Sequence, residues 1–393
     1  MAGRGRRGRS PRRLGLVLAW LALAAAAPAD PPHQRPSDML GWTAQQQEDG
    51  FKRIATLFPV HLARRSPHPR PLPRSRRPLP IPPATVEAFM AAQRVSGLLV
   101  IQDGRIVLER YGLGRTPADP WSAFSVAKSV TSILVGAALQ DGAIKSLDDP
   151  VTRYLPEMRG GAYDQVSVRE LVTMTSGVRW TEDYADLSSD VVRIGSWAGE
   201  PGIDPLVSYM RTLPRVAPPG TRFQYKSGEA DLAGVLVARA VGMPMAAYLE
   251  KRIWRPAGME ADAAWIHNAA GNDRGGCCLS LGLRDSGRLG LLMLNGGQAG
   301  GRRILPKAWV AAATTKQVDT GYPDMGYGYL WWTRPGGEFQ ANGIFGQTID
   351  VIPDERLVIV VNSAWPRPSD RAMAAERAAF IDKLRAAART RPN

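Results

Sequence analysis

The stretch SVAKSVTSILVGAAL, residues 125–139, is the most informative part of this 393-residue chain. It begins with a hydroxyl and an amine, Ser125 and Lys128, and continues as an apolar run that predicts a buried helix. Residues three apart lie on one face of a helix, about 4.5 Å apart along its axis. Ser125 would stand at the helix start, where the first backbone N–H groups lack intrahelical partners. The spacing indicates a serine activated by a lysine, although an ordinary helix start with a solvated lysine fits it as well.

Strand patterns flank this helix at both ends of the chain. Before it, the β-rich runs 97–102 and 105–110 are separated by Asp103-Gly104, a dipeptide typical of a tight hairpin. After it, strands are expected at residues 327–333, 338–342, 348–352 and 357–362.

Between the two groups of strands, residues 141–275 have mostly helical and loop patterns, and a final amphipathic helix is expected over 369–388. Strands from both ends of a chain can join one sheet only if the middle is an insertion. We therefore predict an α+β fold, an antiparallel sheet flanked by helices with an inserted, mostly helical lobe over about 141–275. A cleft is expected between the two lobes.

The first 29 residues have the pattern of an export signal. Six arginines and no acid precede the apolar run 14–27, and Ala27-Pro28-Ala29 offers a cleavage site. The run is shorter than the roughly 18–20 residues of a membrane-spanning helix, so no stable membrane anchor is expected. Export by the general secretory route fits, as does the twin-arginine route because of Arg12-Arg13. The expected location is the periplasm or the medium.

Residues 30–84 are predicted to be an N-terminal segment followed by a linker rich in proline and arginine. A helix is expected around 46–57, and the eight prolines of residues 66–83 favour an extended spacer. Folded structure is expected to begin near Thr85 with a helix over 85–94, and a single hydrolase domain is predicted over residues 85–390.

The net charge of +14 is concentrated before this domain, because residues 85–393 carry only +3. Charges there are interspersed, so no nucleic-acid partner is expected. Neither the four histidines nor the cysteines have the spacing of a metal site, and no cofactor is expected. The adjacent Cys277 and Cys278 fit either a vicinal disulfide or two buried thiols.

Several motifs, in this order along the chain, match one family over residues 97–388. The chain resembles the serine β-lactamase and penicillin-binding-protein superfamily, in the class C-like branch with esterases, D-amino-acid peptidases and 6-aminohexanoate-dimer hydrolases. The matching motifs are FSVAK at 124–128, SLDDPV at 146–151 with YLPE at 154–157, TSG at 175–177, FQYKS at 223–227 and GIFGQ at 343–347.

The resemblance implies that Ser125 is the acylated nucleophile and that Lys128 and Tyr225 share the proton transfers. It also implies an oxyanion hole made by the backbone N–H groups of Ser125 and Ile344, beside Gly343. Glycine at that place would let the substrate approach the backbone closely.

Two departures from the β-lactamase pattern bear on the substrate. Ala341-Asn342-Gly343 stands where those enzymes have Lys-Thr-Gly, so the cation that would hold a β-lactam's carboxylate is missing. Tyr225-Lys226-Ser227 replaces their Tyr-x-Asn, which removes an amide. Efficient β-lactam hydrolysis is therefore not expected. Ser227, Asn342 and Gly343 remain candidate substrate contacts.

Two aromatic residues are further candidates for substrate binding. Tyr184 lies in the acidic-aromatic loop 182–184, where the resemblance places a substrate-binding tyrosine. Trp331 and Trp332 must face opposite sides of an expected strand, and we assign Trp331 to the cleft.

The sequence thus predicts an exported serine hydrolase that cleaves small esters or amides through an acyl-enzyme. Alternatives stay open: a β-lactamase, D-aminopeptidase or DD-peptidase acting on penicillin or cell-wall peptides, and a non-catalytic peptidoglycan-binding relative. A Ser-His-Asp hydrolase would depend on His267, the only histidine after residue 68. The oligomeric state is not indicated.

Overall fold

The structure is a computed structural model that describes residues 1–3 and 35–391. The chain divides into two units, Met1–His33 and Gln34–Asn393, and every helix and strand below lies in the second. The export signal predicted for residues 1–29 lies almost wholly outside the described residues. Among the described residues no single helix has the length and apolar character to cross a membrane, and one helix pair, bent by 69°, meets that test only jointly.

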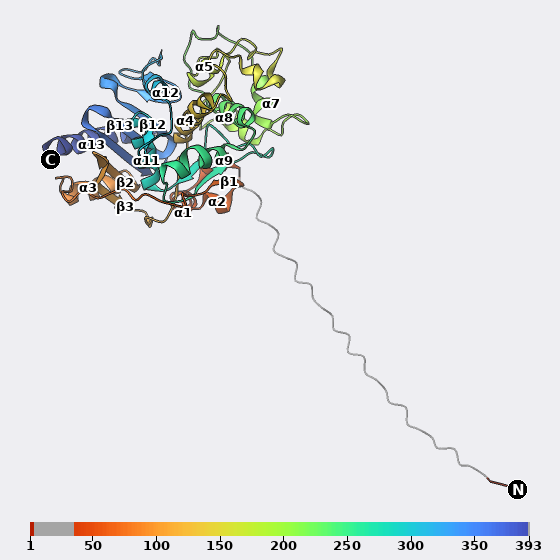
Figure 1. The fold of residues 1–393 in the computed structure, drawn as a ribbon, viewed down its shortest axis with the longest axis horizontal. Helices are drawn as coiled ribbons and strands as arrows, with labels where there is room; N and C mark the ends of the chain where they lie inside the picture. Colours follow the sequence, from red (N-terminus) through yellow and green to blue (C-terminus); the bar gives the residue numbers. More distant parts are fainter. Residues whose placement is uncertain (4–34, 392–393) are drawn as a thin grey trace. The chain divides into compact units, whose positions relative to one another are not determined.

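An antiparallel eight-stranded sheet organises one lobe (Figure 1). Its order is β3-β2-β14-β13-β12-β11-β10-β9, so strands from the two ends of the domain, β2 and β14, are neighbours. This arrangement confirms the predicted α+β fold. The strands are β2 Val95–Gln102, β3 Arg105–Tyr111, β9 Val318–Asp319, β10 Gly326–Tyr327, β11 Trp332–Thr333, β12 Phe339–Gly343, β13 Gln347–Ile352 and β14 Leu357–Ser363.

The β2–β3 hairpin turns at the predicted dipeptide. Asp103 and Gly104 have φ angles of 51° and 72°, the left-handed conformations that a type I′ turn requires. Alternate residues of β2 then face opposite sides of the sheet, and each side is covered by helices.

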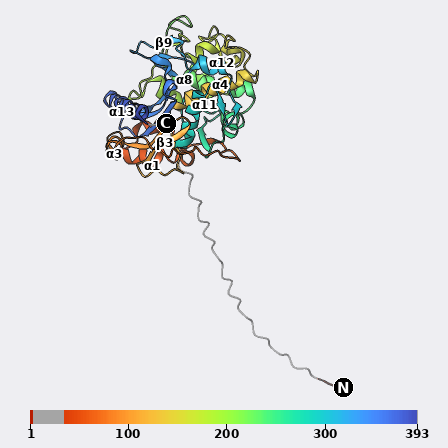
Figure 2. The ribbon, with the colours of Figure 1, turned by 60° about the vertical axis from the view of Figure 1, so that its left-hand side comes forward.

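One face of the sheet packs against α3 (Pro83–Ala92) and α13 (Arg371–Thr390), which lie side by side in Figures 1 and 2. The rings of Phe89 and Phe380 stack there with centroids 3.7 Å apart. The other face packs against α11 (Leu283–Leu294) and, at β12, against α4 (Val126–Gln140). Burial on both faces explains the nearly continuous apolar sequence of β2 and β14.

The inserted region is mostly helical, and its longest helix, α8, packs against α4. The α-helices within it are α5 Val168–Val172, α6 Asp190–Arg193, α7 Pro205–Arg211, α8 Ser227–Val241, α9 Met245–Leu249 and α10 Arg255–Ala257. Short helical turns are η2 Val151–Arg153, η3 Pro156–Met158, η4 Ile194–Ser196 and η5 Glu250–Trp254. After α11 come β7 Gln298–Ala299, β8 Arg302–Arg303, α12 Lys307–Ala313, η6 Pro335–Gly337, η7 Ile344–Gly346 and η8 Pro353–Glu355.

Among the described residues the first helix begins at Pro36, so the expectation that folded structure starts near Thr85 is wrong. Residues 36–63 form η1 Pro36–Gly41, α1 Ala44–Gly50, α2 Ile54–Leu57 and β1 Val60–Ala63. β1 pairs with β5 (Ala263–Ile266) in a second sheet, β1-β5-β6-β4, with β6 at Leu279–Leu281 and β4 at Trp121–Ser122. These elements are too short for a clear period, but buried side chains such as Phe51 and Ile54 anchor them.

The proline-rich residues 66–82 contain no helix and no regular strand. They run beside β3, where the Ser75 N–H donates to the Ile106 carbonyl at 2.9 Å and the Leu79 N–H donates to the Val107 carbonyl at 3.0 Å. The stretch is extended, but it is attached to the sheet.

Candidate active site

Ser125 and Lys128 meet at the start of α4. The Lys128 Nζ donates to Ser125 Oγ at 2.8 Å and to the Gly276 carbonyl at 2.7 Å. Ser125 is 8% exposed and Lys128 is 2% exposed, so this is not a solvated surface lysine. The amine is held between the hydroxyl and a fixed backbone oxygen, within the reach that proton transfer needs.

The backbone around the serine is strained, and aromatic packing holds it. Phe124, directly before Ser125, has a φ of 46°, and Phe345, directly after Ile344, has a φ of 60°. Such conformations cost about 1–3 kcal/mol each and persist only where the surroundings enforce them. The two rings lie 5.1 Å apart, and Phe51 packs on them at 4.9 and 5.5 Å. The sequence motifs include Phe124 and Phe345, but nothing in a phenylalanine indicates a positive φ, and no motif pointed to Phe51.

The end of β12 lies directly against the nucleophile. A Cβ atom added to Gly343 would be 2.6 Å from the Ala123 carbonyl oxygen and 3.2 Å from the Ser125 nitrogen. Ile344, the next residue, lines the same cavity as Ser125. The structure thus brings together the two residues to which the resemblance assigns the oxyanion hole. Their role as donors stays a prediction.

Tyr225 lies beside Lys128, with its ring centroid 5.0 Å from Nζ. Its ring stacks on Trp332 at 5.6 Å. Trp331 is fully buried and packs edge-on against Phe339, so its assignment to the cleft is wrong.

The physical reason for this error is a tight turn. The expected strand 327–333 is broken between β10 and β11, where Leu330 has a φ of 58° and the Gly328 N–H donates to the Trp331 carbonyl. Trp332, not Trp331, is therefore the first strand residue after the turn, and it is the one that reaches the aromatic group around Tyr225.

Glu182 organises the predicted substrate side of the site. Its carboxylate accepts hydrogen bonds from the Ser227 N–H at 2.9 Å, from the Ser227 hydroxyl, from the Tyr184 hydroxyl at 2.7 Å and from the Trp180 indole. Burial and the Glu182 charge raise the pKa of Tyr184 well above its ordinary value, so this tyrosine is a neutral hydrogen-bonding group. Tyr184 and Ser227 both line the cavity, whereas the sequence analysis treated Glu182 only as part of a loop.

Asp231 fixes the carbonyl that holds the lysine. Its carboxylate accepts the Gly276 N–H at 2.8 Å and pairs with Arg274 at 2.8 Å. Asp231 is fully buried, and Gly276 in turn accepts from Lys128. A buried carboxylate on α8 therefore positions the amine through a single residue, Gly276.

The Thr-Ser-Gly motif has a similar supporting contact. Lys226 and Glu229, both fully buried, form an ion pair at 3.2 Å, and the Ser176 hydroxyl donates to the same Glu229 carboxylate. Burial raises the pKa of Glu229. The motif thus anchors the start of α8, immediately after Tyr225.

Ser125 and several of the residues around it line a small cavity of about 60 Å³. Gly343 abuts it, whereas Asn342 is half-buried on β12 with an amide oxygen that has no partner among the described residues. The lining comes from both lobes and from η1: Pro36, Ser37, Met39, Leu40, Phe124, Ser125, Tyr184, Val191, Gly195, Ser227, Asp231, Arg274, Gly276, Cys277 and Ile344. Cys277 and Cys278 are linked to each other as a disulfide.

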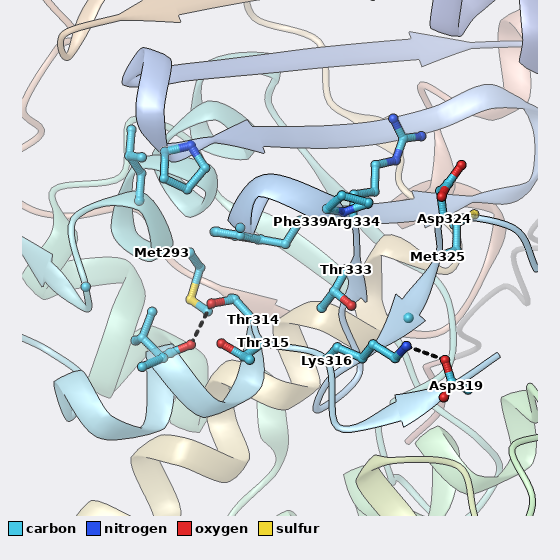
Figure 3. Close-up of a pocket in the computed structure, with 18 of the residues that line it drawn as sticks. Met293, Thr314, Thr315, Lys316, Asp319, Asp324, Met325, Thr333, Arg334 and Phe339 are labelled. Atoms are coloured by element: carbon cyan, nitrogen blue, oxygen red, sulfur yellow. Dashed lines mark hydrogen bonds and ion pairs between the residues drawn. The ribbon is translucent and has the colours of Figure 1, made fainter.

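A larger hollow of about 670 Å³ lies elsewhere, between α12 and the strands β9–β11 (Figure 3). Its charged groups include Lys316 and Asp319, which pair with each other and are largely exposed. Neither Ser125 nor Lys128 lines it. Ser125, which is hydrogen-bonded to Lys128, lies at the smaller hollow.

The alternative Ser-His-Asp arrangement, which depends on His267, is not assembled around Ser125. His267 stacks on His61 at 4.3 Å, and its Nδ1 lies 2.8 Å from the Asn268 carbonyl. The described residues also contain no group of three His, Cys, Asp or Glu side chains that could hold a metal ion.

Comparisons with known proteins agree with this geometry. The Beta-lactamase family model matches residues 83–383. The chain is 31% identical over 288 residues to a 6-aminohexanoate-dimer hydrolase of Paenarthrobacter ureafaciens, an alignment that covers 70% of this chain and 73% of that protein. It is 33% identical over 144 residues to Esterase EstB of Burkholderia gladioli, covering 34% of this chain and 36% of the esterase.

A solved structure from Bacillus anthracis, provisionally assigned as a 6-aminohexanoate-dimer hydrolase, has the same fold. It superposes with a TM-score of 0.75 at 20% identity and covers 86% of this chain and 93% of that one. The chain therefore belongs to the Beta-lactamase family and is a serine hydrolase within it.

Proposed function

We propose that the protein cleaves small carboxylic esters and amides through an acyl-enzyme formed on Ser125. The observation that carries this proposal is the 2.8 Å contact between the buried Lys128 Nζ and Ser125 Oγ, which lines a small cavity. The linear amide oligomers and short acyl esters suggested by the relatives are the leading substrate classes.

In the first step, the amine of Lys128 accepts the proton of Ser125 as Oγ bonds to the substrate carbonyl carbon. The backbone N–H groups of Ser125 and Ile344 stabilise the resulting oxyanion, an effect worth about 2.7–4 kcal/mol per donor. Tyr225 gives a proton to the departing alcohol or amine and regains one from Lys128. Water then attacks the ester carbonyl and gives a proton to the same groups, which deliver one to Oγ as the C–Oγ bond breaks and the acid leaves.

A fluorophosphonate probe with intact-mass readout tests the nucleophile. We expect one label per chain in the wild type and none in Ser125→Ala, which should also lose at least about 10⁴-fold in turnover of p-nitrophenyl acetate. Ser132→Ala is the matched control, because Ser132 is a buried serine on the same helix whose hydroxyl has no partner among the described residues. Labelling that persists in Ser125→Ala would overturn the proposal.

The substrate class is tested with three substrates: p-nitrophenyl butyrate, the linear 6-aminohexanoate dimer and a chromogenic cephalosporin. We expect turnover of the ester or the amide and very slow turnover of the cephalosporin, since Ala341 stands where a lysine would hold its carboxylate. Fast cephalosporin hydrolysis would instead favour a β-lactamase.

We also propose that the protein is exported, on the basis of the arginine-rich start, the apolar run 14–27 and the site Ala27-Pro28-Ala29. Intact mass of the protein from the periplasm or medium should show an N-terminus at Asp30. Full-length protein confined to the cytoplasm would contradict this proposal.

A further inference from the structure

We propose that the disulfide between Cys277 and Cys278 is a thiol–disulfide exchange site beside Ser125, and that its reduction by a small dithiol slows hydrolysis. Cys277 lines the same cavity as Ser125. The two cysteines are the only ones in the chain, so no other residue can exchange with them. This inference rests on the proposed acyl-enzyme function and adds a chemical control to it.

The disulfide begins directly after the carbonyl that holds the amine of Lys128. Gly276 is buried, and its carbonyl accepts a hydrogen bond from Lys128 Nζ at 2.7 Å. That carbonyl and the N–H of Cys277 belong to one planar peptide group. A movement of the backbone at Cys277 therefore turns the carbonyl on which the position of Lys128 depends.

The two cysteines differ in how they are held. Cys278 is 1% exposed, lies in the core cluster that contains Phe124 and is followed directly by β6, which begins at Leu279. Cys277 is half-buried and lines the cavity, and its N–H donates to the Arg274 carbonyl at 3.3 Å. The sulfur of Cys277 is therefore the one that a reagent can reach, and Cys277 is the residue that has room to move.

The exchange needs a thiolate that reaches Cys277. A thiolate of the dithiol attacks the Cys277 sulfur, the bond between the two sulfurs breaks, and Cys278 leaves as a thiolate that takes up a proton. The second thiol of the reagent then attacks the mixed disulfide. This step releases Cys277 as a thiol and leaves the reagent as a cyclic disulfide, so two electrons and two protons have passed to the protein.

Reduction removes the covalent restraint on the two side chains. Two thiols need more room than two bonded sulfurs, so the side chains must separate, and the packed Cys278 leaves the movement to Cys277. The shift turns the peptide group that joins Gly276 to Cys277 and displaces the acceptor of the Lys128 amine. A misplacement of about 1 Å in a catalytic group can cost about 10²-fold in rate.

The exchange site links activity to the redox state of the surroundings. Cytosolic thiols keep cysteine pairs reduced, whereas disulfides persist in the periplasm and outside the cell. An exported chain would therefore reach its full activity on arrival in an oxidising compartment.

The experiment compares the enzyme purified in air with the enzyme reduced by dithiothreitol. N-ethylmaleimide, added after unfolding and followed by intact mass, should label neither cysteine in the first and both in the second. We expect reduction to lower kcat for p-nitrophenyl acetate by at least about tenfold, with a smaller change in KM, and reoxidation with diamide to restore it. Two free thiols in the enzyme purified in air, or an unchanged kcat in the reduced enzyme, overturns the proposal.

The double variant Cys277→Ser with Cys278→Ser imitates the reduced state, because its two side chains are not joined. It should have the kcat of the reduced wild type and should not respond to dithiothreitol. Thermal unfolding followed by circular dichroism shows whether it is folded, and if it is not, the reduction and reoxidation of the wild type decide alone. A folded double variant with the kcat of the oxidised wild type, or with an equal loss of kcat in dithiothreitol, overturns the proposal.

The rate of fluorophosphonate labelling separates this proposal from the function on which it rests. If the oxidised enzyme is not labelled on Ser125, the proposed function fails. If the oxidised and the reduced enzyme are labelled at the same rate, the function stands and only the control by the disulfide fails.

Discussion

At the scale of single residues, the proposed chemistry depends on the amine of Lys128, which is 2% exposed. Lys128 donates to Ser125 and to the Gly276 carbonyl, and the Asp231 carboxylate holds the same glycine by accepting its N–H. The described contacts of the Lys128 amine are the Ser125 hydroxyl, the Gly276 carbonyl and the ring of Tyr225. Tyr225 is the third member of the group and lies over the amine.

Tyr225→Phe is expected to lower kcat/KM for p-nitrophenyl acetate by about 10²–10⁴-fold, the usual contribution of a proton-transfer group. The ring and its stacking on Trp332 remain, so the fold should be unchanged. Tyr327→Phe is the control, because Tyr327 is a buried tyrosine that packs on the ring of Tyr225. If the two variants have equal activity, the Tyr225 hydroxyl has no part in proton transfer.

At the scale of secondary structure, the site depends on the close approach of β12 to the start of α4. Gly343 permits this approach, since any Cβ would meet the Ala123 carbonyl at 2.6 Å. The backbone itself needs no glycine there, because the φ of Gly343 is −132°. Glycine is therefore needed at position 343 for the space that it leaves beside Ser125.

Gly343→Ala should push β12 away from the nucleophile and lower kcat by about 10²–10³-fold, as the loss of one oxyanion donor does. Thermal unfolding should change little, because the strand ends at this residue. Gly282→Ala, at an open position with a φ of −68°, provides the comparison. Wild-type kcat in Gly343→Ala would show that the strand end does not bind the oxyanion.

Elements with a strong local signal were predictable from the sequence. The hairpin at Asp103-Gly104, the helix after Ser125 and the last three strands have clear periods or turn residues, and the structure has them within a few residues. The candidate site residues Ser125, Lys128 and Tyr225 were predicted from ordered motifs, and the structure places them side by side.

The elements that escaped prediction depend on long-range packing. Residues 36–63 form short elements that pack against distant parts of the chain, as in the contact of Phe51 with Phe124 and the pairing of β1 with β5. The choice between Trp331 and Trp332 depends on a turn at Leu330, where no glycine marks the positive φ. Phe51 acts through Phe124 and Phe345, a contact that no local pattern encodes.

At the scale of the whole molecule, the N-terminal segment is part of the enzyme. Its buried side chains Met39, Phe51, Ile54 and Phe58 join the core beside the nucleophile. The segment supplies strand β1 and, through η1, part of the lining of the cavity beside Ser125. It also supplies the ring of Phe51, which packs on Phe124 and Phe345.

A chain that begins at Thr85 is therefore expected not to fold stably. Each of the four buried side chains contributes about 1.5–3 kcal/mol, and together they rival the net stability of a domain. A chain that begins at Gln34 should unfold like the mature protein. The measurement is thermal unfolding followed by circular dichroism, and equal midpoints for the two chains would contradict this role.

Acid stability should depend on Glu109 of β3, whose side chain is 2% exposed. Burial raises the pKa of Glu109, but its hydrogen bonds with Arg284 and Tyr111 and the charge of Arg74 bring it below the usual value of 4.5. The folded protein thus binds this proton less tightly than the unfolded chain does. The carboxylate's contribution to stability is complete above pH 4.5 and is lost as the pH falls through the lowered pKa.

Glu109→Gln should lower the free energy of unfolding by about 2 kcal/mol at neutral pH. The variant should also lose less stability than the wild type when the pH is lowered from 7 to 3. Urea unfolding at the two pH values measures both quantities. Parallel losses in the two proteins would show that Glu109 is not the responsible group.

The pairing of β2 with β14 has a consequence for how the protein is made. The β2–β3 hairpin is synthesised early, but β14, which pairs with the other edge of β2, is translated more than 250 residues later. Until then, a long apolar strand has an open edge, which is a template for wrong pairing with other chains. The newly made polypeptide therefore depends on being kept apart from its neighbours until its last strand and helix have been released.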